Sequence, residues 1–205
     1  MDLADDGLYI DGYTNGRLGG ARRGSWDAYV ASVSFDGRVV WLRQFGSSEA
    51  DYGTGLLSGS RSVYVSGKTL GTLHHARNRG GSDAFVRKFS PRGSTVWTRQ
   101  FGTRRGDAAR AVARVQHEIV AVGKTAGAFP GQTNLGAGDV FARGFHAATG
   151  DPQWSFQFGS SARDTVGWAW GGANRAYVIG NSAGAFPGED SRGGIDSYLA
   201  RIDTT

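Results

Sequence analysis

The segment Gly180-Asn181-Ser182-Ala183-Gly184 has the spacing of a nucleophile elbow, in which a serine on a strand-to-helix turn attacks an acyl group. Three other parts of the chain carry a matching Gly-x-Thr-x-Gly pattern, at Gly12–Gly16, Gly67–Gly71 and Gly123–Gly127. No helical periodicity follows any of the four copies. Because such a motif indicates chemistry only in its structural context, the sequence predicts a repeated turn here and no catalytic serine.

Carboxylates and histidines form no clear metal motif. Gly80-Gly81-Ser82-Asp83 and Gly193-Gly194-Ile195-Asp196 are similar to calcium-binding Gly-Asp repeats, but those repeats have a period of about nine residues. We expect the repeated aspartates to accept backbone N–H groups at strand starts; they are Asp27, Asp83, Asp139 and Asp196, with Asp51, Asp107 and Asp164 at the next turn. Ion binding by a ring of these carboxylates is the alternative.

The adjacent residues His74 and His75 are expected in an extended loop, where their side chains would point in opposite directions. That arrangement does not suit one metal ion. The sequence therefore predicts no metal site and no cofactor.

Arginine dominates the positive charge of this chain, whose formal net charge is +5 and whose lysines are Lys68, Lys88 and Lys124. Arginine favours bidentate contacts with carboxylate or phosphate, although a coding bias would give the same excess. A group of basic residues lies in segments predicted to be long loops: Arg17, Arg22, Arg23, His74, His75, Arg77, Arg79, Arg104 and Arg105, with Arg163 and Arg192 further along. They are the candidate ligand-binding residues.

The hexapeptide Trp97-Thr98-Arg99-Gln100-Phe101-Gly102 has copies at Trp41–Gly46 and Trp154–Gly159, spaced 56 and 57 residues apart. A fixed period of this size indicates one supersecondary unit copied along the chain. Three further blocks repeat in register: a short apolar strand that ends in glycine, an Asp-led strand with alternating hydrophobicity, and a strand of small residues such as Ala108 to Val115.

The unit therefore has four strands, which we expect to be antiparallel because every connection is a loop. Four-stranded units repeated along a chain are typical of a β-propeller, in which each blade buries its faces on its neighbours. The succession of a Gly-ending strand, Asp83-Ala84-Phe85-Val86, a glycine turn and Trp97–Gly102 resembles the SBBP repeat, named for a seven-bladed β-propeller. The resemblance spans essentially the whole chain. It implies a propeller fold and bacterial cell-surface or secreted proteins, but no shared reaction.

With the small-residue strand innermost, one domain over residues 1–205 would hold blades at roughly 1–46, 47–102, 103–159 and 160–205, the last lacking its outer strand. A seven-bladed ring would need about 390 residues. The chain is therefore predicted to be a partial or small ring: a fragment, a closed four-bladed ring, or half of a ring completed by self-association. An open arc would expose two apolar blade faces.

In antiparallel blades, the loops after the Gly-ending strand and after the Trp strand share one face of the disc. These are the long loops, with 14 residues between Gly12 and Asp27 and 15 between Gly67 and Asp83. We call this side the long-loop face. Binding residues concentrate on such loops, so an anionic partner is expected there: an acidic polysaccharide, a phosphate-bearing polymer or an acidic protein surface. A merely solvated face is the alternative.

Aromatic residues are expected mostly between blades. Trp41, Trp97 and Trp154 occupy matching positions and predict inter-blade packing. Trp168 and Trp170 break the pattern and share one face of a strand, either as core or as a stacking platform. The loop residues Phe129 and Phe186 are either buried or presented to a ligand.

No apolar run approaches the roughly 20 residues that span a bilayer, and the acidic N-terminus lacks a signal core, so only the family resemblance points to the cell surface. The chain has no cysteine. The predicted function is a non-catalytic binding or scaffold module. A structural repeat segment of a larger surface protein is the alternative, followed by an enzyme with a site at the channel mouth. No nucleic-acid module is present.

Overall fold

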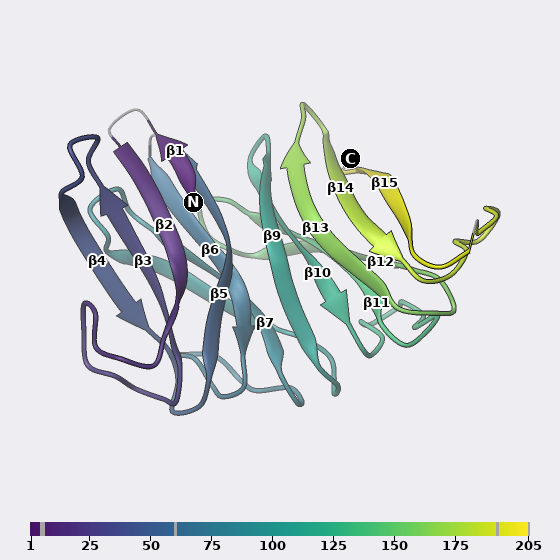
Figure 1. Ribbon diagram of the computed structural model, residues 1–205, viewed down its shortest axis with the longest axis horizontal. Helices are drawn as coiled ribbons and strands as arrows, with labels where there is room; N and C mark the ends of the chain where they lie inside the picture. The colour runs from purple at the N-terminus through teal and green to yellow at the C-terminus, as the bar shows by residue number, and fades with distance from the viewer. Residues whose placement is uncertain (5–6, 60, 192, 205) are drawn as a thin grey trace.

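A computed structural model describes residues 1–4, 7–59, 61–191 and 193–204, and these residues form 15 strands and no helix. The strands make four antiparallel sheets that stand in a row, with β4 at one end of the molecule and β15 at the other (Figure 1). The all-β class and the antiparallel strands predicted from the repeat are confirmed. No helix in the described part of the chain is long and apolar enough to cross a membrane.

Each sheet follows the chain order of its strands. The first contains β1 (Asp2–Ala4), β2 (Gly7–Thr14), β3 (Asp27–Val33) and β4 (Val39–Phe45). The second contains β5 (Asp51–Gly59), β6 (Ser62–Thr69), β7 (Asp83–Phe89) and β8 (Thr95–Phe101). The third contains β9 (Asp107–Val115), β10 (Glu118–Thr125), β11 (Asp139–His146) and β12 (Pro152–Phe158). Among the described residues the fourth has three strands: β13 (Asp164–Gly171), β14 (Arg175–Ser182) and β15 (Asp196–Asp203).

Successive sheets pack face to face, with a separate apolar core at each junction. Alternation along a strand sends neighbouring side chains to opposite cores. In β6, for example, Val65 packs toward the first sheet and Tyr64 toward the third. The first strands of successive sheets, β1, β5, β9 and β13, lie next to one another.

Glycine at the end of the second strand permits a close approach between strands. A Cβ added at Gly67 would lie 1.9 Å from the Tyr52 carbonyl oxygen, and one at Gly123 would lie 2.0 Å from that of Ala108. The pairing register shifts at these places, as at a β-bulge. This contact explains the glycine in the second, third and fourth units, where Gly180 lies in the same way against the Thr165 carbonyl oxygen; Gly12 of the first unit lies against the Tyr29 ring instead.

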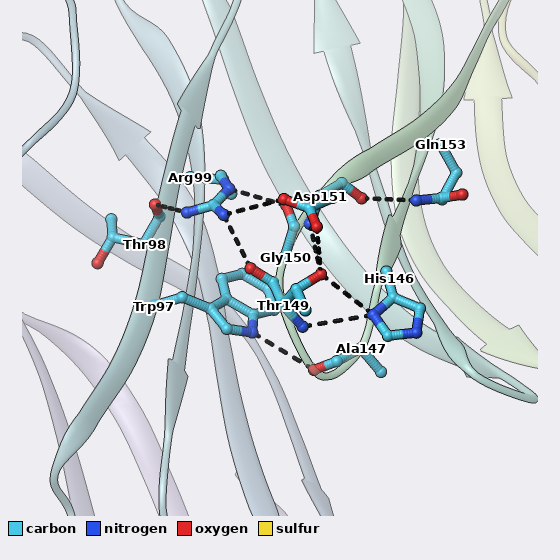
Figure 2. A network of polar contacts seen from close by, with 9 residues as sticks. All are labelled: Trp97, Thr98, Arg99, His146, Ala147, Thr149, Gly150, Asp151 and Gln153. Carbon is cyan, nitrogen blue, oxygen red and sulfur yellow. Dashed lines mark hydrogen bonds and ion pairs between the residues drawn. The ribbon is translucent and has the colours of Figure 1, made fainter.

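The first two copies of the hexapeptide hold their sheet to the next one along the chain, as Figure 2 shows for Trp97 and Arg99. The Trp97 indole Nε1 donates to the Ala147 carbonyl oxygen at 3.4 Å, and Arg99 Nε donates to that of Gly150 at 2.8 Å. Both acceptors lie in the turn between β11 and β12. We call this contact the turn clamp.

Glycine is required in the clamped turn. Gly150 has a φ of 74°, and a Cβ there would lie 2.7 Å from the Trp97 ring. The first junction repeats the arrangement: Trp41 Nε1 donates to Pro91 O at 2.8 Å, and Arg43 Nε donates to Gly93 O at 3.0 Å. The prediction that the repeated tryptophans pack between units is confirmed for Trp41 and Trp97.

The third copy of the hexapeptide behaves differently. Trp154 Nε1 donates to Glu118 Oε2 of its own sheet at 3.0 Å, although the ring also packs on the core between the third and fourth sheets. Phe156 replaces the arginine of the other two copies and is 45% exposed. Among the described residues, no turn of the fourth unit packs against Trp154 or Phe156 in the way that the clamped turns do.

The outward face of the fourth sheet is apolar and uncovered. Trp168, Ile179 and Leu199 are register partners across its three strands and are 59%, 42% and 65% exposed. Trp170 stacks on Tyr177 in the next row, with ring centroids 5.2 Å apart. Trp168 and Trp170 are therefore not core residues within the described chain.

The two kinds of long loop meet at each junction, which confirms that they share one face. The Asp51 N–H donates to the Trp26 carbonyl oxygen at 2.8 Å, so the loop between β2 and β3, at the lower left of Figure 1, contacts the one between β4 and β5. Equivalent bonds join Asp107 to Ser82 and Asp164 to Gly138.

Candidate functional site

Four of the candidate arginines line one shallow pocket of about 680 Å³ on the long-loop face. Arg77 and Arg79 come from the loop between β6 and β7, and Arg104 and Arg105 from the loop between β8 and β9. The segment from Gly127 to Pro130 of the third unit closes the pocket's other side. We call this the arginine pocket; it lies at the junction of the second and third sheets.

Buried aspartates set the paths of both loops. Asp83 Oδ2 accepts the Arg79 N–H at 2.8 Å and a Gln100 side-chain N–H at 2.8 Å. Asp107 Oδ2 accepts the Thr103 N–H at 2.6 Å, and Thr103 Oγ1 in turn accepts the Arg105 N–H at 3.1 Å. The loop backbones are thereby held by the sheet, while the guanidinium groups are left to face solvent.

The arginine pocket is electropositive. Within the described residues, none of its four guanidinium groups has a carboxylate oxygen within 4.0 Å. Arginine offers a planar fork of N–H donors that matches carboxylate and phosphate oxygens. Such an arrangement can hold an anionic group but supplies no nucleophile or general base.

The other candidate residues lie outside this pocket. Arg17, Arg22 and Arg23 are exposed in the loop between β2 and β3, where Arg22 Nε donates to the Gly24 carbonyl oxygen at 2.8 Å. Arg192 falls outside the described residues.

The predicted arrangement of His74 and His75 is wrong. Their ring centroids are 3.7 Å apart, because His75 has a φ of 61° and the backbone is not extended there. The two rings pack on one another. They precede Arg77 and Arg79 in the same loop but do not line the arginine pocket.

The repeated aspartates accept backbone N–H groups, as predicted. The acceptors are Asp27, Asp51, Asp83, Asp107, Asp139 and Asp164, with donors three or four residues before each. They also meet in pairs: a Cβ at Gly46 would lie 2.6 Å from Asp51 Oδ2 and 2.7 Å from Asp27 Oδ1. This crowding explains the glycine that ends each hexapeptide.

Burial raises the pKa of Asp51 and of Asp107 above the ordinary value of 3.8, although hydrogen bonds from neighbouring threonine and serine groups oppose the rise. In the described chain no three His, Asp or Glu side chains gather in a way that could hold a metal ion.

The resemblance to a nucleophile elbow reflects a turn, as predicted. The Ser182 hydroxyl oxygen accepts the Gly184 N–H at 3.1 Å, and Thr14, Thr69 and Thr125 accept the equivalent bonds in the other units. Ser182 is buried, and no helix follows it among the residues that the structure describes. Of the two loop phenylalanines, Phe129 is buried between the second and third sheets and Phe186 is half-buried.

Sequence reasoning missed three cationic residues near Arg163: Lys68, Arg110 and Lys124. They lie on strands rather than loops, so a search restricted to loops overlooked them. One signal was available, because Lys68 and Lys124 occupy the same place in Gly67-Lys68-Thr69 and Gly123-Lys124-Thr125.

A comparison of the chain with protein-family models gives no match, and neither does a comparison with curated proteins.

Proposed function

We propose that this chain is a β-propeller segment of the SBBP-repeat type that serves as a non-catalytic binding module, with an anionic polymer or acidic protein surface as its partner. Four sheets that pack face to face, with their first strands side by side, support the propeller assignment. The observation that carries the binding role is the convergence of Arg77, Arg79, Arg104 and Arg105 in one pocket with no carboxylate partner in the described chain.

The test is titration of the protein with polygalacturonate, an acidic polysaccharide, at low and high salt. Exposed charge contacts weaken as salt rises, so the affinity falls between the two conditions. The double variant Arg104→Gln/Arg105→Gln is expected to lower the affinity by about tenfold or more, because each charge-assisted contact contributes about 1 kcal/mol.

Arg61→Gln/Arg92→Gln is the matched control, since it removes the same charge from turns on the opposite face. An equal loss in both double variants would show that net charge alone governs binding, and salt-independent binding would contradict an electrostatic site.

A second candidate function is a structural repeat segment whose neighbours cover its end sheets, either in a longer array or through a second copy of the chain. The uncovered row of Trp168, Ile179 and Leu199 favours it, because soluble proteins rarely expose such a patch. Light scattering on a sizing column tests this candidate. A dimer or aggregate supports it, and a stable monomer near 21.7 kDa contradicts it.

A further inference from the structure

We propose that a second, smaller pocket on the long-loop face binds a phosphate or sulfate ester group of the partner. The inference rests on the proposed function, since it names the anionic group that this face takes. Lys68, Arg110, Lys124 and Arg163 line the pocket, which has a volume of about 280 Å³. We call it the inner pocket, because β9, the first strand of the third sheet, forms part of its wall.

Three repeat units contribute to the inner pocket. Lys68 comes from β6, Arg110 from β9, Lys124 from β10, and Arg163 from the loop that leads to β13. Such a pocket exists only when the second, third and fourth units are packed together. It is therefore a product of the assembled fold and not of one loop.

The four cations are not neutralised by the described residues. Across the described ranges, none of them has a carboxylate oxygen within 4.0 Å. Asp107 and Asp164 also line the pocket, but both are buried and accept hydrogen bonds from Thr103 and Ser160 of the linking loops. Lys68 is further held over the Tyr52 ring, with Nζ 4.8 Å from its centroid.

The proximity of these cations is unfavourable without an anion. Partial burial lowers the pKa of Lys124, and the neighbouring charges of Arg163, Arg110 and Lys68 lower it further. A bound anion would reverse this effect by favouring the charged ammonium group.

The scaffold does not require the cations. The position of Lys68 and Lys124 is occupied by Tyr13 and Asn181 in the outer units. The position of Arg110 carries Thr54 and Gly167, and that of Arg163 carries Ala50 and Gly106. A residue that the turn or strand needs would recur, as the aspartates do, so the clustering of cations in the middle of the chain indicates a ligand.

The chemistry favours a compact group with several oxygens and more than one negative charge. The two guanidinium and two ammonium groups come from four separate segments, and a tetrahedral phosphate or sulfate offers them more acceptor oxygens than a planar carboxylate. The arginine pocket is more than twice as large and suits the continuation of an extended partner.

The test is calorimetric titration with inorganic phosphate and with inorganic sulfate, against chloride at equal ionic strength. The variants Lys124→Asn and Arg163→Ala copy residues that the chain already tolerates at equivalent positions, so we expect them to fold. Each should weaken phosphate and sulfate binding by about tenfold. Arg61→Gln/Arg92→Gln is the control, since it removes the same charge from turns on the opposite face, and it should leave the affinity for these small ions unchanged.

Absence of phosphate and sulfate binding above chloride, or equal affinities in Lys124→Asn and the unaltered protein, would overturn the inner pocket. The proposed function fails separately, if polygalacturonate does not bind or binds independently of the arginine pocket. Titration with polyphosphate, dextran sulfate and neutral dextran then identifies which ester group of the partner the inner pocket binds. Tighter binding of polyphosphate assigns a phosphate ester, tighter binding of dextran sulfate assigns a sulfate ester, and equal binding of dextran itself contradicts both.

Discussion

The junction between the second and third sheets and the junction between the third and fourth are built from copies of one hexapeptide, yet only the first is clamped. At the first of these, Trp97 and Arg99 grip the turn at Gly150 of the next unit. At the other, Trp154 bonds to its own sheet and Phe156 stands in place of the arginine. The difference indicates that the hexapeptide acts by contacting the following unit. Its contribution to stability therefore depends on a turn in that unit.

The largest effect should come from the glycine of the clamped turn. Gly150→Ala forces a side chain into a left-handed backbone and against the Trp97 ring, so we expect the free energy of unfolding to fall by about 3 kcal/mol. Gly37→Ala is a natural control, because Gly37 has a similar φ of 83° but no atom within 4 Å of an added Cβ. It should cost about 1 kcal/mol. Equal costs in urea unfolding would show that the tryptophan contact is unimportant.

The next effect in size should be a difference between Trp97 and Trp154 in what each contributes to the free energy of unfolding. Trp97 is 7% exposed and Trp154 is half-buried. We expect Trp97→Ala to lower the free energy of unfolding by about 3 kcal/mol, and Trp154→Ala by about half as much. Thermal unfolding followed by circular dichroism measures both. A larger loss for Trp154→Ala would refute the idea that a clamp needs its turn.

The arginine of the clamp should contribute less. Arg99 Nε and Nη2 donate to Gly150 and Thr149 carbonyl oxygens, but the side chain is 35% exposed. Arg99→Gln should therefore cost about 1 kcal/mol. Phe156→Arg restores the repeat pattern at a place where no turn of the described chain lies against it, and it should leave the urea midpoint nearly unchanged. A gain in stability equal to the loss in Arg99→Gln would contradict the comparison.

The smallest effect should be a pH dependence at the two clamped junctions, where Asp51 and Asp107 lead the strands that follow. Their raised pKa means that the folded protein holds the proton more tightly than the unfolded chain. Their contribution to the free energy of unfolding therefore increases as pH falls from neutral through the raised pKa, and it levels off below 3.8. Asp107→Asn should flatten this trend in urea unfolding between pH 7 and pH 4, and an unchanged slope would contradict the assignment.

The strands could be predicted because the chain repeats itself. Each copy of Asp-Ala-Phe-Val or of the hexapeptide tests the same assignment, and the aspartates could be assigned to turns because they recur. For Arg77, Arg79, Arg104 and Arg105, the sequence predicts only that they share the long-loop face, and not that they line one pocket. Which arginines meet depends on how the loops fold over the junction, and that path has no periodic signal.

Two features were beyond sequence reasoning for physical reasons. The left-handed backbone at His75 is set by the local path of its loop, and no adjacent glycine or proline in the sequence indicates it. The inner pocket joins Lys68 to Arg163 across 95 positions in the chain, so it appears only when the packing of three units is known.

The turn clamp also bears on how the protein is made. Trp97 and Arg99 bond to groups about 50 residues later in the chain, so the outer edge of a unit stays unfinished until most of the next unit has left the ribosome. At synthesis rates of roughly 5–20 residues per second, that interval is about 3–10 seconds. During this time an apolar indole is open to chaperones and to neighbouring nascent chains. Slow translation of the segment around Gly150 would lengthen the exposure, and a faster codon choice there would shorten it.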